Sequence, residues 1–110
     1  MQARDLGGIT VIDVGVKELD YTICNDFKRQ VDQILDKSNG HLLVNLSEVA
    51  FLDSLGIGTL ITIRNRLIKN KKEVALVGVG EQVRKVINVM ALQKIFPLFE
   101  SEEEAKEKLP

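Results

Sequence analysis

Asp53 and Ser54 start the stretch of the chain best suited to chemistry, because Gly56 and Gly58 follow them directly after the apolar run 42–46. Aspartate and serine are favoured at the start of a helix, where their oxygens accept hydrogen bonds from unpaired backbone N–H groups. The positive end of the helix dipole also tolerates added negative charge. The Ser54 hydroxyl is therefore either a helix cap or a group that could carry a phosphate.

Spacing alone favours the capping role for Ser54. Gly56 and Gly58 are a weak phosphate-loop signal, because the third glycine of a dinucleotide fingerprint and the Gly-Lys-Ser/Thr of a P-loop are both missing. Cys24 and His41 are far apart in the sequence and make a poor nucleophile–base pair or metal-ligand set. We therefore expect no enzymatic activity, no metal and no cofactor.

The composition is that of a single globular domain over residues 1–110, with 45% hydrophobic and 28% charged residues. A formal net charge of -1 gives no general attraction to nucleic acid or to an anionic membrane. One cysteine excludes an internal disulfide and fits a reducing compartment. No apolar run approaches the roughly 18 residues of a membrane span, and residues 1–5 lack the apolar core of a signal peptide. We expect a cytoplasmic protein.

Strands and helices alternate along the chain. The β-branched run 10–16 and the apolar runs 42–46 and 74–77 predict strands. Residues 1–6 are expected to pair beside the first of these strands through a Gly7-Gly8 turn. Pro97 restricts 95–99 to a sheet edge or a short strand. Helical periodicity predicts helices from Thr22 to about 38–40, over 54–71 and over 81–90, with a last helix from Ser101. This order predicts an α/β domain with a mixed central sheet of four to five strands and about four helices.

The helices carry apolar faces that we expect to be buried, and their ends carry capping signals. The first helix is expected to begin after 20–22, with Asp20 as an entry residue and Thr22 as a cap, and to end at a left-handed Asn39 or Gly40. Arg64 to Lys72 is a basic cluster that we interpret as a solvated face. The expected inward residues are Ile23, Phe27, Val31, Ile34, Leu35, Ile57, Leu60, Ile61, Leu67, Ile68, Val83, Val86, Ile87 and Met90.

This order of elements and the Asp-Ser-x-Gly-x-Gly turn resemble the STAS domain and, more narrowly, bacterial anti-sigma factor antagonists. The matching residues lie in 18–20, 45–49 and 51–58. The similarity extends from the strand at Thr10 to the helix at Ser101. The turn is short, but it is fairly specific when it lies between a buried strand and a helix.

The resemblance implies a mechanism. The serine at Ser54 would be phosphorylated by a partner that is both an anti-sigma factor and an ATP-dependent serine kinase. The unmodified protein would bind that partner and free a sigma factor, the phosphorylated protein would not bind, and a serine phosphatase would restore it. Related antagonists often carry a second Ser or Thr where this chain has Leu55, so Ser54 is the one hydroxyl in the turn.

The resemblance also assigns a contact surface. Asp20 lies beside the serine in related antagonists and contacts the kinase, the glycines permit close approach, and Leu55 and Ile57 reach the partner if they are exposed. The expected partner-binding residues are Asp20, Thr22, Asp53, Leu55, Gly56, Ile57 and Gly58.

Two alternatives stay open. The chain could be the STAS subunit of another regulatory or transport assembly, or a STAS module that binds a nucleotide directly. The bound partner separates the first alternative from the antagonist, and calorimetry with ATP and GTP separates the second.

Overall fold

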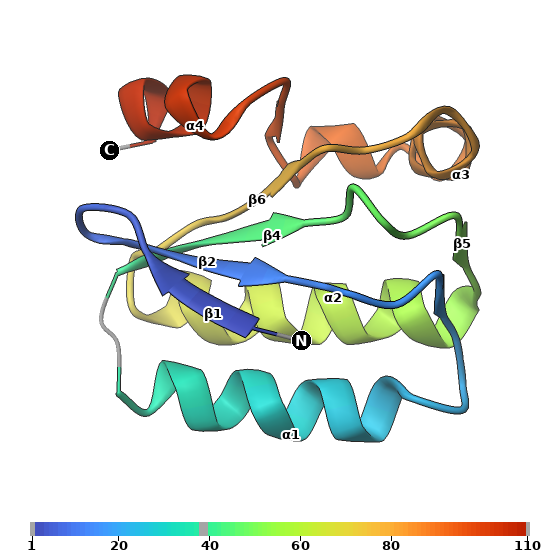
Figure 1. Cartoon of the computed structure of the whole chain (residues 1–110), viewed down its shortest axis with the longest axis horizontal. Helices are drawn as coiled ribbons and strands as arrows, with labels where there is room; N and C mark the ends of the chain where they lie inside the picture. Colours follow the sequence, from blue (N-terminus) through green and yellow to red (C-terminus); the bar gives the residue numbers. More distant parts are fainter. Residues whose placement is uncertain (1, 38–39, 110) are drawn as a thin grey trace.

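A central sheet of five strands forms the middle layer of the protein, in a computed structural model that describes residues 2–37 and 40–109. Its strands run in the order β1-β2-β4-β6-β7 (Figure 1). The first pair, β1 and β2, is antiparallel and the other pairs are parallel. The predicted mixed sheet is therefore confirmed. The strands are β1 (Gln2–Asp5), β2 (Ile9–Asp13), β4 (His41–Asn45), β6 (Val74–Val77) and β7 (Leu98–Phe99).

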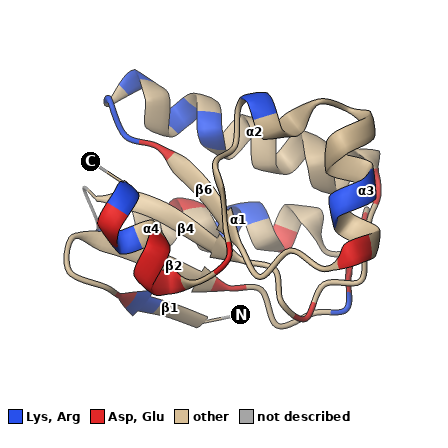
Figure 2. Ribbon diagram, turned by 90° about the horizontal axis from the view of Figure 1, so that it is seen from above, with Lys and Arg blue, Asp and Glu red and all other residues tan. Residues whose placement is uncertain are grey.

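Helices cover both faces of this sheet. Two of them, α1 (Cys24–Leu35) and α2 (Ser54–Lys69), lie together on one face (Figure 1). The last helix, α4 (Glu102–Lys108), lies over the opposite face (Figure 2). The remaining helix, α3 (Glu81–Val89), buries Val83 and Ile87 in the same core as α1 and α2. A short 3-10 helix, η1 (Leu92–Lys94), which the sequence did not predict, follows α3. Helical crossovers of this kind are what parallel strand pairs require.

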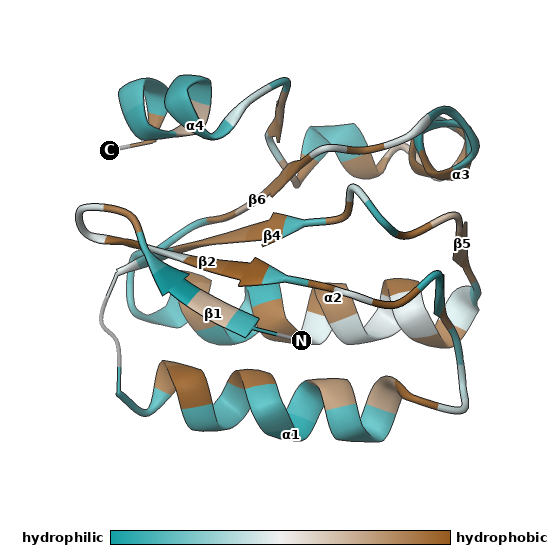
Figure 3. Ribbon diagram, in the orientation of Figure 1, coloured by the Kyte–Doolittle hydropathy of each residue, from teal (hydrophilic) through white to brown (hydrophobic). Residues whose placement is uncertain are grey.

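The two faces of the sheet carry separate cores because side chains alternate along each strand. On β4, Leu42 and Val44 belong to a large cluster that includes Phe27 of α1. The intervening Leu43 belongs to a smaller cluster that includes Ala105 of α4. Figure 3 shows the apolar sides of the helices turned toward the sheet. A strand buried on both faces explains why this segment reads as a continuous apolar run.

A second, smaller sheet lies beside the main one and was not predicted. It pairs β3 (Glu18–Leu19) with β5 (Phe51–Leu52) in parallel, so that Leu19 lies opposite Leu52. Each strand has two residues, too few for an alternating pattern to be visible in the sequence. This pairing brings the loop after β3 beside the start of α2.

Several predicted boundaries differ from the structure. The first long strand ends at Asp13 rather than at Val16, although the Val14 amide still donates to Asn45 O at 3.1 Å. The second long helix ends at Lys69 because Lys71 adopts a positive φ of 60°. Gly40 is not in the left-handed conformation that was predicted; a Cβ there would lie 2.1 Å from Gly8 O. Ser38 and Asn39 lie outside the described residues.

Two residues predicted to be inward are exposed. Ile68 is 43% exposed because it lies to one side of the buried stripe of α2, where Ile63 was missed and is 2% exposed. Met90 is 52% exposed because it follows the last residue of α3 and projects beyond the part of that helix that packs on the sheet. The remaining predicted core positions are buried or half-buried.

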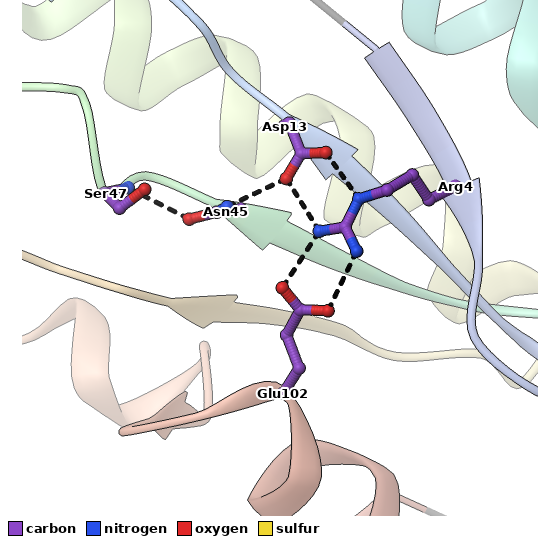
Figure 4. A network of polar contacts seen from close by, with 5 residues as sticks. All are labelled: Arg4, Asp13, Asn45, Ser47 and Glu102. Atoms are coloured by element: carbon purple, nitrogen blue, oxygen red, sulfur yellow. Dashed lines mark hydrogen bonds and ion pairs between the residues drawn. The ribbon is translucent and has the colours of Figure 1, made fainter.

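A polar network ties the first strand to the last helix (Figure 4). The Arg4 guanidinium donates to both carboxylate oxygens of Asp13, at 2.6 and 2.8 Å, and to both of Glu102, at 3.1 and 2.9 Å. Asn45 Nδ2 also donates to Asp13 at 2.8 Å, and Asn45 Oδ1 accepts from the Ser47 amide at 3.0 Å. The network holds β1, β2, β4 and α4 together, and the hydrogen bonds from Arg4, with a smaller contribution from Asn45, hold the pKa of Asp13 below its usual range.

Replacing Arg4 with Gln should weaken the pH dependence of stability in acid. A carboxyl group with a lowered pKa in the folded state stabilises the fold above its ordinary pKa, and this contribution is lost as the pH falls through the lowered value. We expect Arg4→Gln to reduce the free energy of unfolding at pH 7 and to flatten its decline between about pH 5 and pH 2. Urea unfolding across this range measures both, with Arg29→Gln as an exposed control; an unchanged pH slope would contradict the role given to Arg4.

Candidate functional site

The predicted site lies at the edge of the sheet where the parallel strands end. The loop after β2, the strand β5 and the start of α2 meet at this edge (Figure 1). In α/β folds with parallel strands, ligands and partners bind characteristically at the carboxyl ends of the strands. The fold therefore places the Asp53–Ser54 turn where binding sites usually form.

The Asp53 carboxylate connects the two segments of the site. Its Oδ1 accepts from the Gly56 amide at 2.8 Å, which makes Asp53 the N-cap of α2. Its Oδ2 accepts from the Tyr21 amide at 3.0 Å, in the loop that precedes α1. One carboxylate thus fixes the first turn of α2 against this loop and satisfies a backbone donor on each side.

Ser54 is the first residue of α2 and its side chain is exposed. The capping bond belongs to Asp53, so the interpretation of Ser54 as the N-cap is wrong. No hydrogen bond to the Ser54 hydroxyl is found among residues 2–37 and 40–109. The hydroxyl is therefore accessible to solvent. It lies at the positive end of a helix that has no acidic residue in its first turn.

Asp20 and Thr22 form a compact turn beside this helix. Asp20 Oδ1 accepts from the Thr22 amide at 3.0 Å and from the Thr22 hydroxyl at 2.5 Å, and these bonds lower the pKa of Asp20. Thr22 does not cap the first helix as was expected, because the residue before α1 is Ile23 and it makes no side-chain cap. The structure brings both residues to the predicted surface through the Tyr21–Asp53 contact.

Gly56 and Ile57 point into the fold, which corrects their predicted contact with a partner. A Cβ at Gly56 would lie 2.3 Å from Leu19 O, so this glycine permits α2 to pack against β3. Ile57 is 5% exposed and belongs to the large core. Gly58 and Leu55 are exposed, and they remain candidates for contact with a partner.

Exposed apolar side chains surround the Ser54 turn. Tyr21, Phe51 and Leu55 are 70%, 51% and 55% exposed. Apolar groups that gather on a surface often mark an interaction site. Of these, Tyr21 and Phe51 were missed at the sequence level; the available signal was their position next to Asp20 and two residues before Asp53.

The basic cluster lies toward the other end of α2 (Figure 2). Arg66 donates to Asp32 of α1 at 2.7 Å and to Asp36, the residue that follows α1, at 2.8 Å. Arg64 donates to Ile95 O at 2.9 Å. These arginines therefore tie α2 to its neighbours instead of extending the candidate site.

Cys24 and His41 are both buried in the fold. Cys24 is buried at the start of α1, and burial raises the pKa of its thiol. His41 begins β4 and its Nδ1 accepts from the Glu73 amide at 2.9 Å.

Within the described part of the chain, no three His, Cys, Asp or Glu side chains are grouped to hold a metal ion. Nor does any described helix combine the length and apolar character needed to cross a membrane.

The two glycines of the turn should respond to alanine in opposite directions. Gly56→Ala forces a methyl group against the Leu19 carbonyl and should cost about 1–3 kcal/mol of stability. Gly58→Ala meets nothing within 4 Å and should stabilise the helix by about 0.5–1 kcal/mol. Chemical denaturation of the pair measures both effects. Equal effects of the two substitutions would contradict the packing described for Gly56.

Comparison with known proteins gives the class of this fold and site. A profile of the STAS domain family matches residues 1–105. The chain therefore belongs to the STAS domain family.

Two curated relatives carry a narrower description. A protein of Thermotoga neapolitana, described as a candidate anti-sigma factor antagonist, is 30% identical over 94 residues, which cover 84% of this chain and 83% of the relative. An anti-sigma F factor antagonist of Paenibacillus polymyxa is 29% identical over 87 residues, covering 77% of this chain and 74% of the relative. The homologues of this chain thus include proteins named as anti-sigma factor antagonists.

Solved structures agree with the fold. An anti-sigma factor antagonist from Mycobacterium paratuberculosis superimposes with a TM-score of 0.85 and 26% identity, covering 98% of this chain and 91% of that one. The Bacillus protein SpoIIAA in its phosphorylated form gives 0.72 and 20%, covering 97% and 96%. Murine Slc26a9, an anion transporter, gives 0.80 and 20%, covering 94% of this chain and 18% of the transporter. The last two likenesses show the fold alone.

Proposed function

We propose that this protein is an anti-sigma factor antagonist controlled by phosphorylation of Ser54. The observation that carries the proposal is the exposed Ser54 hydroxyl, at the start of α2 and among exposed apolar side chains. In the unmodified state the protein binds an anti-sigma factor that is also a serine kinase, and a sigma factor is released. The protein acts without catalysing a reaction, in the cytoplasm, and without binding nucleic acid or membrane.

The contact surface of the unmodified protein consists of the Ser54 turn and the loop before α1. Tyr21 and Leu55 supply apolar area on either side of the serine, and Gly58 leaves room along the helix. Asp20 and Thr22 form the polar border of this surface. A buried apolar centre with a polar border is the usual composition of a protein interface.

Phosphorylation blocks binding through charge and bulk. A phosphate adds about −1.5 to −2 charges at neutral pH, beside the carboxylates of Asp53 and Asp20. A partner surface that faces these carboxylates then meets a concentrated negative patch and an added group of several atoms. A loss of ~3 kcal/mol in binding energy weakens an interface by more than about a hundredfold.

The fold survives the modification. The helix dipole stabilises negative charge at the start of α2. The cap from Asp53 to Gly56 does not involve the Ser54 side chain, so a phosphate there leaves it in place. The unmodified form is therefore recovered when a serine phosphatase removes the phosphate, with no need for refolding.

Incubation with the kinase and ATP should add a single phosphate, at Ser54. Ser54→Ala should abolish labelling, whereas Ser47→Ala, an exposed serine elsewhere on the protein, should be labelled like the natural chain. Mass spectrometry of the intact protein and of its peptides measures the site. Labelling that persists in Ser54→Ala would overturn the assignment.

Ser54→Asp should weaken binding to the anti-sigma factor by at least about tenfold, because about 1.4 kcal/mol corresponds to that factor. Ser54→Asn is the matched neutral control and should bind nearly as tightly as the unmodified chain. Titration calorimetry of the purified pair measures both. Equal affinities of the Asp and Asn variants would show that charge at this position does not control docking.

A second candidate is the STAS unit of another assembly; the anion transporter Slc26a9 contains a region of the same fold. Affinity purification from the native cell separates the two. Recovery of a kinase with an ATPase fold supports the antagonist, and recovery of a transporter or a scaffold supports the alternative.

A further inference from the structure

Four lysine side chains gather where α2 ends, at the end of this helix that is farther from Ser54. One is the last residue of the helix and two lie in the turn that leads into β6, where Figure 2 shows blue segments. The fourth lies beside them because its neighbour Ile95 is held to α2 by the 2.9 Å hydrogen bond from Arg64 Nε. We call these residues the lysine end: Lys69, Lys71, Lys72 and Lys94.

The side chains of the lysine end are not used by the fold. Within residues 2–37 and 40–109, none of them makes an ion pair or a side-chain hydrogen bond. Arg66, by contrast, is paired with Asp32 and Asp36. The helix dipole favours a cation in the last turn of α2, which accounts for Lys69. The other three lysines lie outside α2, so the dipole does not account for them.

Four carboxylates surround the start of α2. The Asp53 carboxylate holds the loop with Asp20 against this helix, and the pairing of β3 with β5 brings Glu18 to the same place. The loop 46–50, which carries Glu48, is tied to the residue before β3 by a backbone hydrogen bond of 2.7 Å. We call these residues the acidic end: Glu18, Asp20, Glu48 and Asp53.

The two ends are too far apart to neutralise each other within one molecule. The 16 residues of α2 span about 24 Å at the rise of an α-helix, and the longest extent of the protein is 29 Å. Salt at physiological ionic strength screens charges beyond about 8 Å. Glu73 lies in the lysine end and Lys17 in the acidic end, but each end keeps an excess of its own sign. Every copy of the chain therefore carries two complementary surfaces that only a second molecule can bring together.

We infer that the lysine end of one copy binds the acidic end of a second copy and covers its Ser54 turn. The charge complementarity of these two surfaces supports this pairing, whatever other partner the protein has. Because the surfaces lie at opposite ends of the molecule, the contact is heterologous and leaves one free end of each kind, so that short chains can form. A copy bound in this way keeps a modifying enzyme away from the Ser54 hydroxyl.

The association is weak and depends on salt, because exposed ion pairs contribute little individually. We expect a Kd on the order of 1 mM at low salt and a rise of at least about tenfold between about 0.02 M and about 0.5 M salt. Amide chemical shifts of the natural chain, measured by NMR over a concentration series, give the Kd and the residues involved. The shifts should change at both ends together, over 17–20 and 48–54 and over 69–73. A monomer at both salt concentrations, or association that high salt leaves unchanged, would overturn the inference.

Two double variants test the pairing of the ends directly. Lys69→Gln with Lys72→Gln weakens the lysine end, and Glu18→Gln with Glu48→Gln weakens the acidic end. Each variant alone should raise the Kd of self-association by about fivefold. An equimolar mixture should associate with nearly the natural affinity, because each molecule then offers the intact end that the other needs. A mixture that associates no better than either variant alone would overturn the inference.

The matched control is Lys85→Gln with Lys108→Gln, which removes two exposed lysines outside the lysine end and changes the net charge by the same amount. This variant should self-associate like the natural chain. An equal loss in the control would assign the association to net charge and overturn the pairing of the two ends.

Charge at Ser54 separates this inference from the proposed function. Ser54→Asp adds a negative charge to the acidic end and should lower the Kd of self-association by roughly two- to fivefold relative to Ser54→Asn. The expected direction is opposite to that for binding of the anti-sigma factor, and the measurement needs no kinase. Equal values for the two variants would show that the contact does not cover Ser54 and would overturn the inference, while leaving the proposed function intact.

Discussion

The two hydrogen bonds of the Asp53 carboxylate determine how the site is built. One oxygen holds the first turn of α2 and the other holds the loop that leads into α1. The pairing of β3 with β5 brings the serine turn and the Asp20 loop side by side, and this bridge fixes them against each other. With it they form one surface whose geometry follows from the sheet beneath. The close approach of Gly56 to Leu19 keeps helix and strand near enough for the bridge to form.

A rigid arrangement suits the proposed switch, which works by charge. The parallel strands are buried on both faces, and the helices that leave them are anchored by apolar clusters. The Arg4 network closes the opposite side of the sheet by joining β1 to α4. In the proposed switch the core does not have to move, because the phosphate is added to an exposed hydroxyl and acts on recognition by the partner. The energetic difference between the two proposed states would then fall on the partner interface.

The architecture could be predicted from the sequence because its signals are local. Apolar runs such as Val74–Val77 and helical periodicity around Phe27 do not depend on distant residues. The site was predicted in part. Asp53 and Ser54 were found as a helix start, but which of them is the cap depends on backbone geometry. Gly56 and Ile57 were assigned to a partner because the sequence does not show that Gly56 packs against Leu19 or that Ile57 belongs to the core. Tyr21 and Phe51 were missed because exposure is a property of the folded chain.

The pairing of β3 with β5 has a consequence for cooperativity. It is a separate ladder of two residues on each strand, with far fewer backbone bonds than the five-stranded sheet. Both strands nevertheless bury a leucine in the large core, with Leu19 0% and Leu52 4% exposed. Opening the ladder would therefore uncover core side chains, so the segment that leads into Ser54 is coupled to the main body of the fold.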